Sequence, residues 1–350
     1  MLSHVDLPHA SYSGGVLRVE YAWLHSSTDP AYEPAHDCPR DTRPVVVFLH
    51  EGLGSVSMWR DFPSQLCQTV GAYGLVYSRE GYGNSTPRPL GQAWQPTFMH
   101  HQAQVVLPAL LRVLGVSASQ RDVVLLGHSD GASIALLAAL AMPDIQGVVA
   151  MSAHTFVEDQ TIDAIKQATG LYKHIFDAAK DQSKGFRQAL SRHHADTDSA
   201  FGGWSSVWLS PAFSAWDIRQ EIAGIRCPCT VLQGLDDPYG SNAHAESIKT
   251  AVPQTQIIYL EQCGHNPHKD CARQVEQAVR AFLSSLSTSA YVSLYKLWGR
   301  QVNVRVLGLS RLHPCMRAHA MRHSKRMNKC TGAFITYCMR GTGNTLAAAQ

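Results

Sequence analysis

Residues Leu125–Ser133, "LLGHSDGAS", carry a chain from an apolar run into an apolar helix through one serine. The run before the turn, Val123–His128, is typical of a strand buried on both faces, and Gly131–Ala141 predicts a buried helix. A tight strand-to-helix turn lifts the Ser129 side chain clear of the sheet and puts the next N–H at a helix N-terminus, where an anion is favoured. The pattern predicts that Ser129 is a nucleophile. The alternative is that Ser129 caps the helix.

Strands and helices alternate on both sides of this turn. Apolar runs predict buried strands, and Val16–Leu24 alternates as a half-exposed strand. The buried strands are expected at Val45–His50, Gly74–Ser78, Val123–His128, Gly147–Ala153, Cys229–Gly234 and Thr255–Glu261. The other helices are expected at Trp59–Thr69, with a start delayed by Pro63, and at Met99–Leu114, Ala243–Ala251 and Lys269–Ser285. We therefore predict an α/β fold with a doubly wound, mostly parallel sheet.

Two further polar residues follow later strands in a suggestive order. Asp236 and Asp237 follow the strand that ends at Gly234, and His265 follows the next strand. A serine hydroxyl needs a base to become nucleophilic, and a histidine needs an acid to hold its tautomer. The order Ser, Asp, His is the one used by α/β-hydrolases. His265 is the expected base, and the choice between the two aspartates stays open on this ground alone.

The chain resembles the α/β-hydrolase superfamily from about residue 16 to 286. The motifs that carry the resemblance are "HEGLGS", "GYGNS", "GHSDGAS", "GLDDP" and "CGHNPH". In that superfamily the acid usually stands three residues after the strand-ending glycine and often before proline, which implies Asp237, with Asp236 as the fallback. The superfamily also implies a helical cap, expected here as an insertion at about 154–216, where no buried strand is predicted.

The oxyanion hole implied by the fold needs two N–H donors. The N–H of Asp130 is one candidate, and the N–H of Gly52 in "HEGLGS" is the other. Glu51 stands where the common pattern has a glycine. Its carboxylate either points away and pairs with a base such as Arg79, or tunes the site.

Asp130 and the aromatic residues of the cap are the candidate substrate-binding residues. The elbow "SDG" resembles that of biphenyl-hydrolase-like enzymes and valacyclovirases, in which the equivalent aspartate receives an amino group; the alternative is that Asp130 caps the following helix. Trp204 and Trp208 are expected to line an apolar pocket, and Phe201, Phe213 and Trp216 are further candidates. The alternative for these aromatic residues is that they pack the cap onto the body.

Composition is that of a globular protein, with 45% hydrophobic and 16% charged residues among 350. Nine scattered cysteines and the lack of a secretory leader favour reduced thiols and a cytoplasmic protein. No run is long and apolar enough for a membrane span, and no phosphate-binding loop is evident. The paired histidines at 100–101 and 193–194 lack partners at ligand spacing, and Cys227–Cys229 indicates a strand entry rather than half of a zinc site. We therefore expect neither a cofactor nor a metal.

The last 64 residues differ from the rest of the chain. No acidic residue follows Glu276, and ten of the 30 basic residues lie after Ser287, so the preceding part is mildly acidic. We expect residues 1–286 to form the hydrolase domain and residues 287–350 to be a basic extension that is disordered or not a native domain. A basic arm for nucleic acid or an acidic membrane is the alternative.

Together these patterns predict a serine hydrolase that cleaves a carboxylic ester, thioester or amide of a small substrate through an acyl-enzyme. Two alternatives remain: a carbon–carbon bond hydrolase or lyase of the same fold, and a non-catalytic binding protein on this scaffold. The expected partner is a small-molecule substrate, with no nucleic acid or membrane bound by the hydrolase domain. The oligomeric state stays open.

Overall fold

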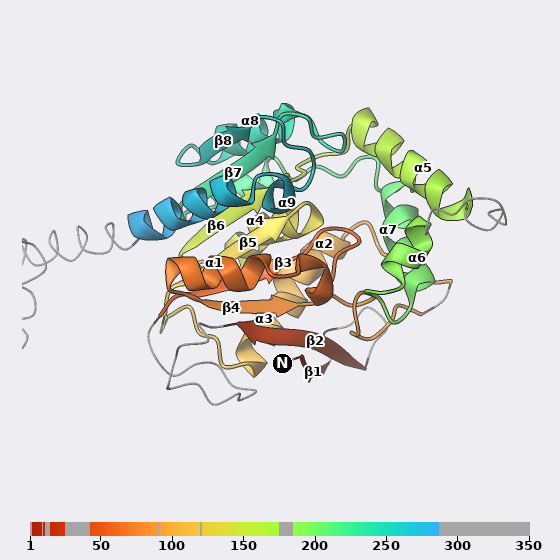
Figure 1. The fold of residues 1–350 in the computed structure, drawn as a ribbon, viewed down its shortest axis with the longest axis horizontal. Helices are drawn as coiled ribbons and strands as arrows, with labels where there is room; N and C mark the ends of the chain where they lie inside the picture. Colours follow the sequence, from red (N-terminus) through yellow and green to blue (C-terminus); the bar gives the residue numbers. More distant parts are fainter. Residues whose placement is uncertain are drawn as a thin grey trace, which may run out of the picture. The chain divides into compact units, whose positions relative to one another are not determined.

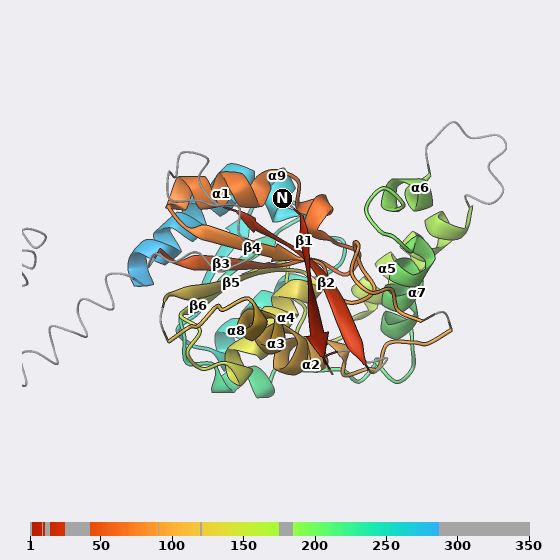
Figure 2. The ribbon, with the colours of Figure 1, turned by 90° about the horizontal axis from the view of Figure 1, so that it is seen from below.

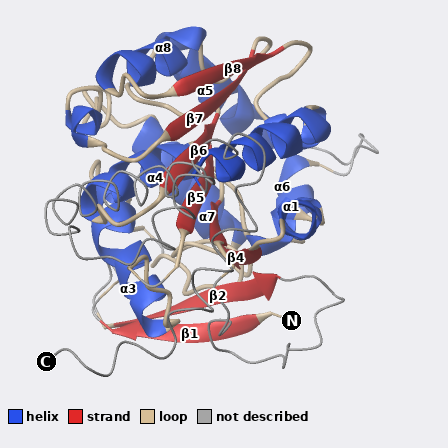
Figure 3. Ribbon diagram, turned by 90° about the vertical axis from the view of Figure 1, so that its left-hand side faces the viewer, coloured by secondary structure: helices blue, strands red, loops and turns tan. Residues whose placement is uncertain are grey.

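Eight strands form one mixed sheet in the computed structural model, which describes residues 2–8, 10, 15–24, 43–89, 91–119, 121–174 and 185–286. Their order is β1-β2-β4-β3-β5-β6-β7-β8, and Figure 3 shows β1 and β8 at opposite edges. The strands are β1 (Ser3–Pro8), β2 (Val16–Leu24), β3 (Val45–Leu49), β4 (Tyr73–Tyr77), β5 (Val123–His128), β6 (Gly147–Met151), β7 (Cys229–Gly234) and β8 (Gln256–Leu260). β1 and β4 each pair antiparallel with β2, and all other pairs are parallel, which confirms the predicted α/β class.

Helices cover both faces of this sheet because alternate strand residues point to opposite sides. Val46 and Phe48 of β3 pack in a cluster with α1 (Phe62–Val70) and the helix of residues 272–286. The remaining side chains of β3 join the larger cluster on the other face, under α4 (Asp130–Ala141). Figures 1 and 2 show α1 on one side of the sheet and α3, α4 and α8 on the other. Burial on both faces explains why the central strands are apolar without alternation.

Two predicted helices are each divided in the structure. The segment predicted at Met99–Leu114 forms α2 (Phe98–His101), a π-helical turn at Gln102–Val106 and α3 (Leu107–Val113). Pro108 stands in the first turn of α3 and has no N–H to donate into the turn before it, so the ladder changes its pattern there. The last predicted helix is divided into α9 (Pro267–Asp270) and the helix of residues 272–286, with Cys271 between them.

Three helices lie together at one end of the sheet, apart from those that cover its faces (Figure 1). They are α5 (Asp159–His174), α6 (Phe186–Leu190) and α7 (Thr197–Trp208), and they fall within the predicted insertion. His194, between α6 and α7, joins them to the loops of the body: its Nδ1 accepts from the Gly83 N–H at 3.0 Å, and its Nε2 lies 3.0 Å from the Leu53 carbonyl oxygen. We call residues 154–216 the cap.

The described residues belong to one unit that ends at Ser287. The predicted basic extension, residues 287–350, lies outside the described part of the chain. Within the described part, no helix combines the length and the hydropathy that crossing a membrane requires.

Candidate active site

Ser129 lies at the apex of the turn between β5 and α4, in a strained backbone conformation with φ 54° and ψ −121°. Both flanking glycines are required by close contacts. A Cβ on Gly127 would lie 2.3 Å from the Gly131 carbonyl oxygen, and one on Gly131 would lie 2.1 Å from the Leu49 carbonyl oxygen. The Ser129 side chain makes no capping hydrogen bond to α4, so the capping alternative is not observed.

Ser129, His265 and Asp237 lie in one hydrogen-bonded line. His265 Nε2 is 2.9 Å from Ser129 Oγ, and His265 Nδ1 is 2.9 Å from both carboxylate oxygens of Asp237. Asp237 also accepts from the Tyr239 N–H at 2.8 Å and from the Gln233 side chain at 3.2 Å. Asp236 is exposed and does not enter this line. The three residues follow the carboxyl ends of β5, β7 and β8, which lie on the same side of the sheet because these strands are parallel.

Burial and hydrogen bonding set the ionisation of this line. Burial lowers the pKa of His265, while Asp237 acts in the opposite direction, so the imidazole is neutral and can accept a proton near pH 7. Burial alone would raise the pKa of Asp237, but its hydrogen bond and electrostatic interaction with His265 outweigh that effect and lower it. The arrangement thus contains a neutral base that is held by an ionised acid.

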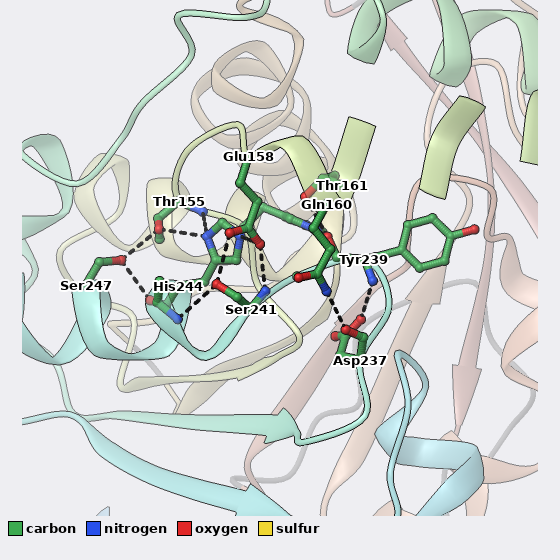
Figure 4. A network of polar contacts seen from close by, with 12 residues as sticks. Thr155, Glu158, Gln160, Thr161, Asp237, Tyr239, Ser241, His244 and Ser247 are labelled. Atoms are coloured by element: carbon green, nitrogen blue, oxygen red, sulfur yellow. Dashed lines mark hydrogen bonds and ion pairs between the residues drawn. The ribbon is translucent and has the colours of Figure 1, made fainter. Parts of the chain in front are cut away.

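The start of the cap holds the loop that carries Asp237 (Figure 4). Gln160 donates to the Asp237 carbonyl oxygen at 2.7 Å, and the Thr161 hydroxyl donates to the Tyr239 carbonyl oxygen at 2.5 Å. Nearby, Glu158 accepts from the N–H and hydroxyl of Ser241, at the start of α8 (Asn242–Ala251).

His244 of α8 completes this contact, because its Nε2 lies 3.1 Å from Glu158 and its Nδ1 accepts from the Thr155 N–H at 3.2 Å. The beginning of α5 is therefore connected by hydrogen bonds to the loop of residues 235–241, which carries Asp237 and which we call the acid loop.

A cavity of about 140 Å³ opens beside Ser129. Gly52 and Asp130, the two predicted oxyanion donors, line it together with Trp204 and Trp208 of α7. A Cβ on Gly52 would lie 2.3 Å from Trp204 Nε1, so only glycine lets the indole lie this close to the backbone. Both tryptophans also pack in the core, so lining and packing are compatible for these residues.

Asp130 points its carboxylate into this region and does not cap α4. Oδ1 accepts from Trp208 Nε1 at 3.2 Å, and Oδ2 lies 4.0 Å from the buried Arg79 guanidinium and has no hydrogen bond. Burial raises the pKa of Asp130 to about 6, against the opposing effects of Arg79 and Trp208. A carboxylate oxygen that has an ion-pair contact with Arg79 but no hydrogen bond therefore lies at the wall of the cavity.

Of the two alternatives for Glu51, the side-chain pair with Arg79 is not observed. The Arg79 guanidinium instead donates to the backbone carbonyl of Glu51 at 2.8 Å. The Glu51 carboxylate lies 3.5 Å from His128 Nδ1. The spacing of motifs could not show this contact because Glu51 follows β3 and His128 ends β5, more than 70 residues later.

The other aromatic candidates pack against neighbouring rings. Phe213 and Trp216 stack on each other in the core, and Phe201 stacks on Tyr172 within the cap. His154, which the sequence analysis did not single out, lines the cavity with an unpartnered Nδ1. His154 follows the carboxyl end of β6, and that position was the signal in the sequence for a residue at the site.

The histidine pairs and cysteines make ordinary contacts. His100 pairs with Glu221 at the surface, and His193 Nδ1 lies 2.9 Å from the Ser57 hydroxyl. Cys229, the first residue of β7, donates weakly to the Cys227 carbonyl. Across the described residues, no three side chains of the ligating types are grouped to hold a metal ion.

Comparison with known proteins shows the family to which this chain belongs. A sequence profile of the alpha/beta hydrolase family matches residues 46–278. The sn-1-specific diacylglycerol lipase ABHD11 of Mus musculus is 24% identical over 270 residues, which cover 69% of this chain and 82% of the lipase. The putative carbamate hydrolase RutD of Pseudomonas syringae pv. syringae (strain B728a) is 25% identical over 272 residues, covering 71% of this chain and 97% of that protein.

Solved structures show the same fold at lower identity. The enol-lactonase from Burkholderia xenovorans LB400 superposes with a TM-score of 0.58 at 17% identity, covering 81% of this chain and 100% of that one. A thermophilic esterase from Thermogutta terrifontis gives a TM-score of 0.55 at 17% identity, covering 81% of this chain and 99% of the esterase. The chain is an enzyme with hydrolase activity, and it belongs to the alpha/beta hydrolase family.

Proposed function

We propose that this protein is a serine hydrolase that cleaves a carboxylic ester, thioester or amide of a small substrate through an acyl-enzyme. The observation that supports this most strongly is the continuous line from Ser129 Oγ through His265 to Asp237, with 2.9 Å at each step, at the wall of a cavity. The names of the relatives, a lipase and a putative carbamate hydrolase, agree with a hydrolytic reaction.

The reaction follows from the geometry in two halves. Ser129 Oγ attacks the substrate carbonyl carbon while its proton passes to His265 Nε2. The N–H groups of Gly52 and Asp130 stabilise the oxyanion, and His265 then protonates the leaving group. In the second half, His265 takes a proton from the water that attacks the acyl carbon, and it returns this proton to Ser129 Oγ as the bond to the acyl group breaks. Asp237 keeps the proton on His265 Nδ1 and stabilises the imidazolium.

The cavity favours a small acyl group that carries a hydrogen-bond donor. Trp204 and Trp208 supply apolar walls, and the volume of about 140 Å³ is that of a cavity that holds a group of roughly the size of one ring. Asp130 Oδ2 and His154 Nδ1 are buried acceptors without a hydrogen bond, and a donor group on the substrate would satisfy them. An amine is the donor that the resemblance to aminoacyl-ester hydrolases implies for Asp130.

Labelling of Ser129 tests the reaction class. The full chain and Ser129→Ala are treated with a fluorophosphonate probe and analysed by intact mass. We expect one adduct on the parent chain and none on the variant. A folded parent chain that takes up no probe would favour the binding-protein alternative.

Turnover of a substrate panel tests the specificity. We expect hydrolysis of small neutral and amine-bearing esters or thioesters, with Ser129→Ala as the blank. Asp130→Ala should lower kcat/KM for an aminoacyl ester by about 100-fold, the worth of a charge-assisted hydrogen bond, and change that for a neutral p-nitrophenyl ester only a few-fold. Equal losses on both substrates would contradict amine recognition, and cleavage of a dienoate carbon–carbon bond without ester turnover would favour that alternative.

A further inference from the structure

A second acid–histidine pair lies beside the proposed triad and takes no part in the proposed proton transfer. Glu51 stands in the loop after β3, next to Gly52, and His128 is the last residue of β5, next to Ser129. The His128 side chain is fully buried and the Glu51 side chain is 16% exposed. The pair therefore joins two loops that each carry part of the site.

His128 faces a hydrogen-bond acceptor at each of its ring nitrogens. Nε2 lies 2.6 Å from the carbonyl oxygen of His265, and Nδ1 lies 3.5 Å from the Glu51 carboxylate, an ion-pair distance at which no hydrogen bond is formed. A neutral imidazole carries one N–H and can serve only one of these acceptors, whereas an imidazolium serves both. The backbone carbonyl cannot donate, so Nε2 carries a proton. The charge of the ring then depends on whether Nδ1 carries a second proton.

The ionisation of Glu51 bears on whether His128 Nδ1 carries a proton. Burial alone would raise the pKa of Glu51, but contact with His128, together with His268 and Lys269, lowers it well below its ordinary value. An ionised Glu51 cannot donate to Nδ1, so two acceptors would face each other at 3.5 Å unless a second proton lies on His128 Nδ1. A buried charge of either sign alone would be costly, and each supplies the other's counter-ion.

We propose that Glu51 and His128 form a buried ion pair with two effects. The pair links the loop of Gly52 to the loop of His265, and its two opposite charges cancel beside the His265 ring. Both are positioning residues, because they act through Gly52 and His265 rather than on the substrate. The His128 and His265 rings lie 5.2 Å apart, close enough for an uncompensated charge to affect the proton affinity of His265. The catalytic part of this inference rests on the proposed hydrolase function, whereas the ion pair itself does not.

Other titratable groups also face this region and remain in place in the variants below. They are His268 and Lys269 of α9, Asp237 and Tyr239 of the acid loop, His154 after β6, Asp130 of α4, and His50 and Arg79 beside Glu51. Because they are constant across the series, differences between variants report on Glu51 and His128.

Imidazole nitrogen NMR tests the ion pair without reference to activity. In the full chain at pH 7, the His128 signals should show protons on both ring nitrogens. In Glu51→Gln, the amide can donate to Nδ1, and His128 should become a neutral ring with its proton on Nε2. A neutral His128 in the parent chain would overturn the proposal, whether or not the protein proves to be a hydrolase.

The pH dependence of fluorophosphonate labelling tests the effect on His265. Labelling slows as His265 becomes protonated, so its acid limb reports the proton affinity of that ring. In His128→Gln the amide keeps the bond to the His265 carbonyl but leaves the Glu51 charge unbalanced. The acid limb should then move to higher pH by about 0.5–1 unit. The double variant Glu51→Gln/His128→Gln should return to within about 0.2 unit of the parent, because both charges are gone.

His100→Gln is the matched control, since His100 pairs with Glu221 at the surface. Its acid limb should coincide with that of the parent chain. A purely structural role would lower labelling in all the buried variants without an upward shift in His128→Gln or its reversal in the double variant, and that result would overturn the charge-cancelling role. If His128→Gln does not fold, the NMR comparison of the parent chain with Glu51→Gln decides the ion pair. Absence of labelling in the parent chain would refute the proposed function and leave the NMR result standing.

Discussion

Asp236 and Asp237 are neighbours in sequence and have different surroundings. Asp237 is buried and accepts hydrogen bonds from His265, the Tyr239 N–H and Gln233. Asp236 is exposed, and its backbone N–H bonds to the Cys263 carbonyl. The sequence order of serine, acid and base predicts that one of the two serves His265. The position three residues after Gly234 selects Asp237, and the structure brings that residue to the imidazole.

Exchanging these two carboxylates for amides gives a direct comparison. Asp237→Asn should lower kcat on an activated ester by about 10³–10⁴-fold, because the amide no longer holds the proton on His265 Nδ1. Asp236→Asn should stay within about two-fold of the parent, as expected for an exposed group outside the line. Steady-state kinetics on both variants checks the assignment, and comparable losses in the two would contradict it.

Strand runs are the elements that the sequence predicts best. The central strands are apolar throughout because they are buried on both faces, and their observed bounds lie within one or two residues of the predicted ones. β1 was missed because Ser3–Pro8 is short and polar in part, and gains its pairing only from β2. Helix breaks were also missed, since the apolar spacing of Met99–Leu114 continues across the π-helical turn.

The turn between β5 and α4 tolerates no side chain at Gly131. Gly131→Ala would place a Cβ 2.1 Å from the Leu49 carbonyl oxygen, and backbone cannot yield as a side chain can. We expect a loss of more than about 2 kcal/mol in the free energy of unfolding, or failure to fold.

Gly170 in α5 provides the contrasting substitution. No atom lies within 4 Å of a Cβ built there, so Gly170→Ala should stabilise the cap by up to about 1 kcal/mol through helix propensity. Urea unfolding of both variants checks the pair. Equal stability changes in the two would show that the close approach at Gly131 is relieved by movement of the backbone.

At the scale of the whole molecule, contacts between loops are what the sequence could not predict. The Glu51–His128 pair and the bonds of His194 to the body join residues that are more than 70 positions apart. Each depends on how strands are ordered in the sheet, which hydropathy does not encode. The order of serine, acid and histidine along the chain was predictable from the sequence. The contacts of the charged residues around them, such as Glu51, were not.

The buried histidines predict that the fold weakens in mild acid. Burial is the main cause that lowers the pKa of His154 to about 3, of His194 to about 4 and of His268 to about 2, and it lowers that of His50 well below its ordinary value. The unfolded chain then binds more protons than the folded one below about pH 6.5. Stability from this source is complete above that pH and is lost as the pH falls toward the folded-state values.

Each such histidine contributes at most about 1.4 kcal/mol per pH unit below its unfolded pKa. The raised pKa of Asp130 opposes this with a single group between about pH 6 and 4. We expect the free energy of unfolding, measured in urea, to be about 2–5 kcal/mol lower at pH 5.5 than at pH 7.5. A stability that is equal or higher at pH 5.5 would mean that these rings are hydrated or relocate on protonation.

The cap lies between β6 and β7, whereas the serine, the acid and the base follow β5, β7 and β8. Hydrogen bonds across adjacent strands fix the spacing of those three side chains, so it does not depend on how many residues the intervening excursion contains. A change in the length or sequence of that excursion could therefore alter the substrate cavity without moving Ser129, Asp237 and His265 apart.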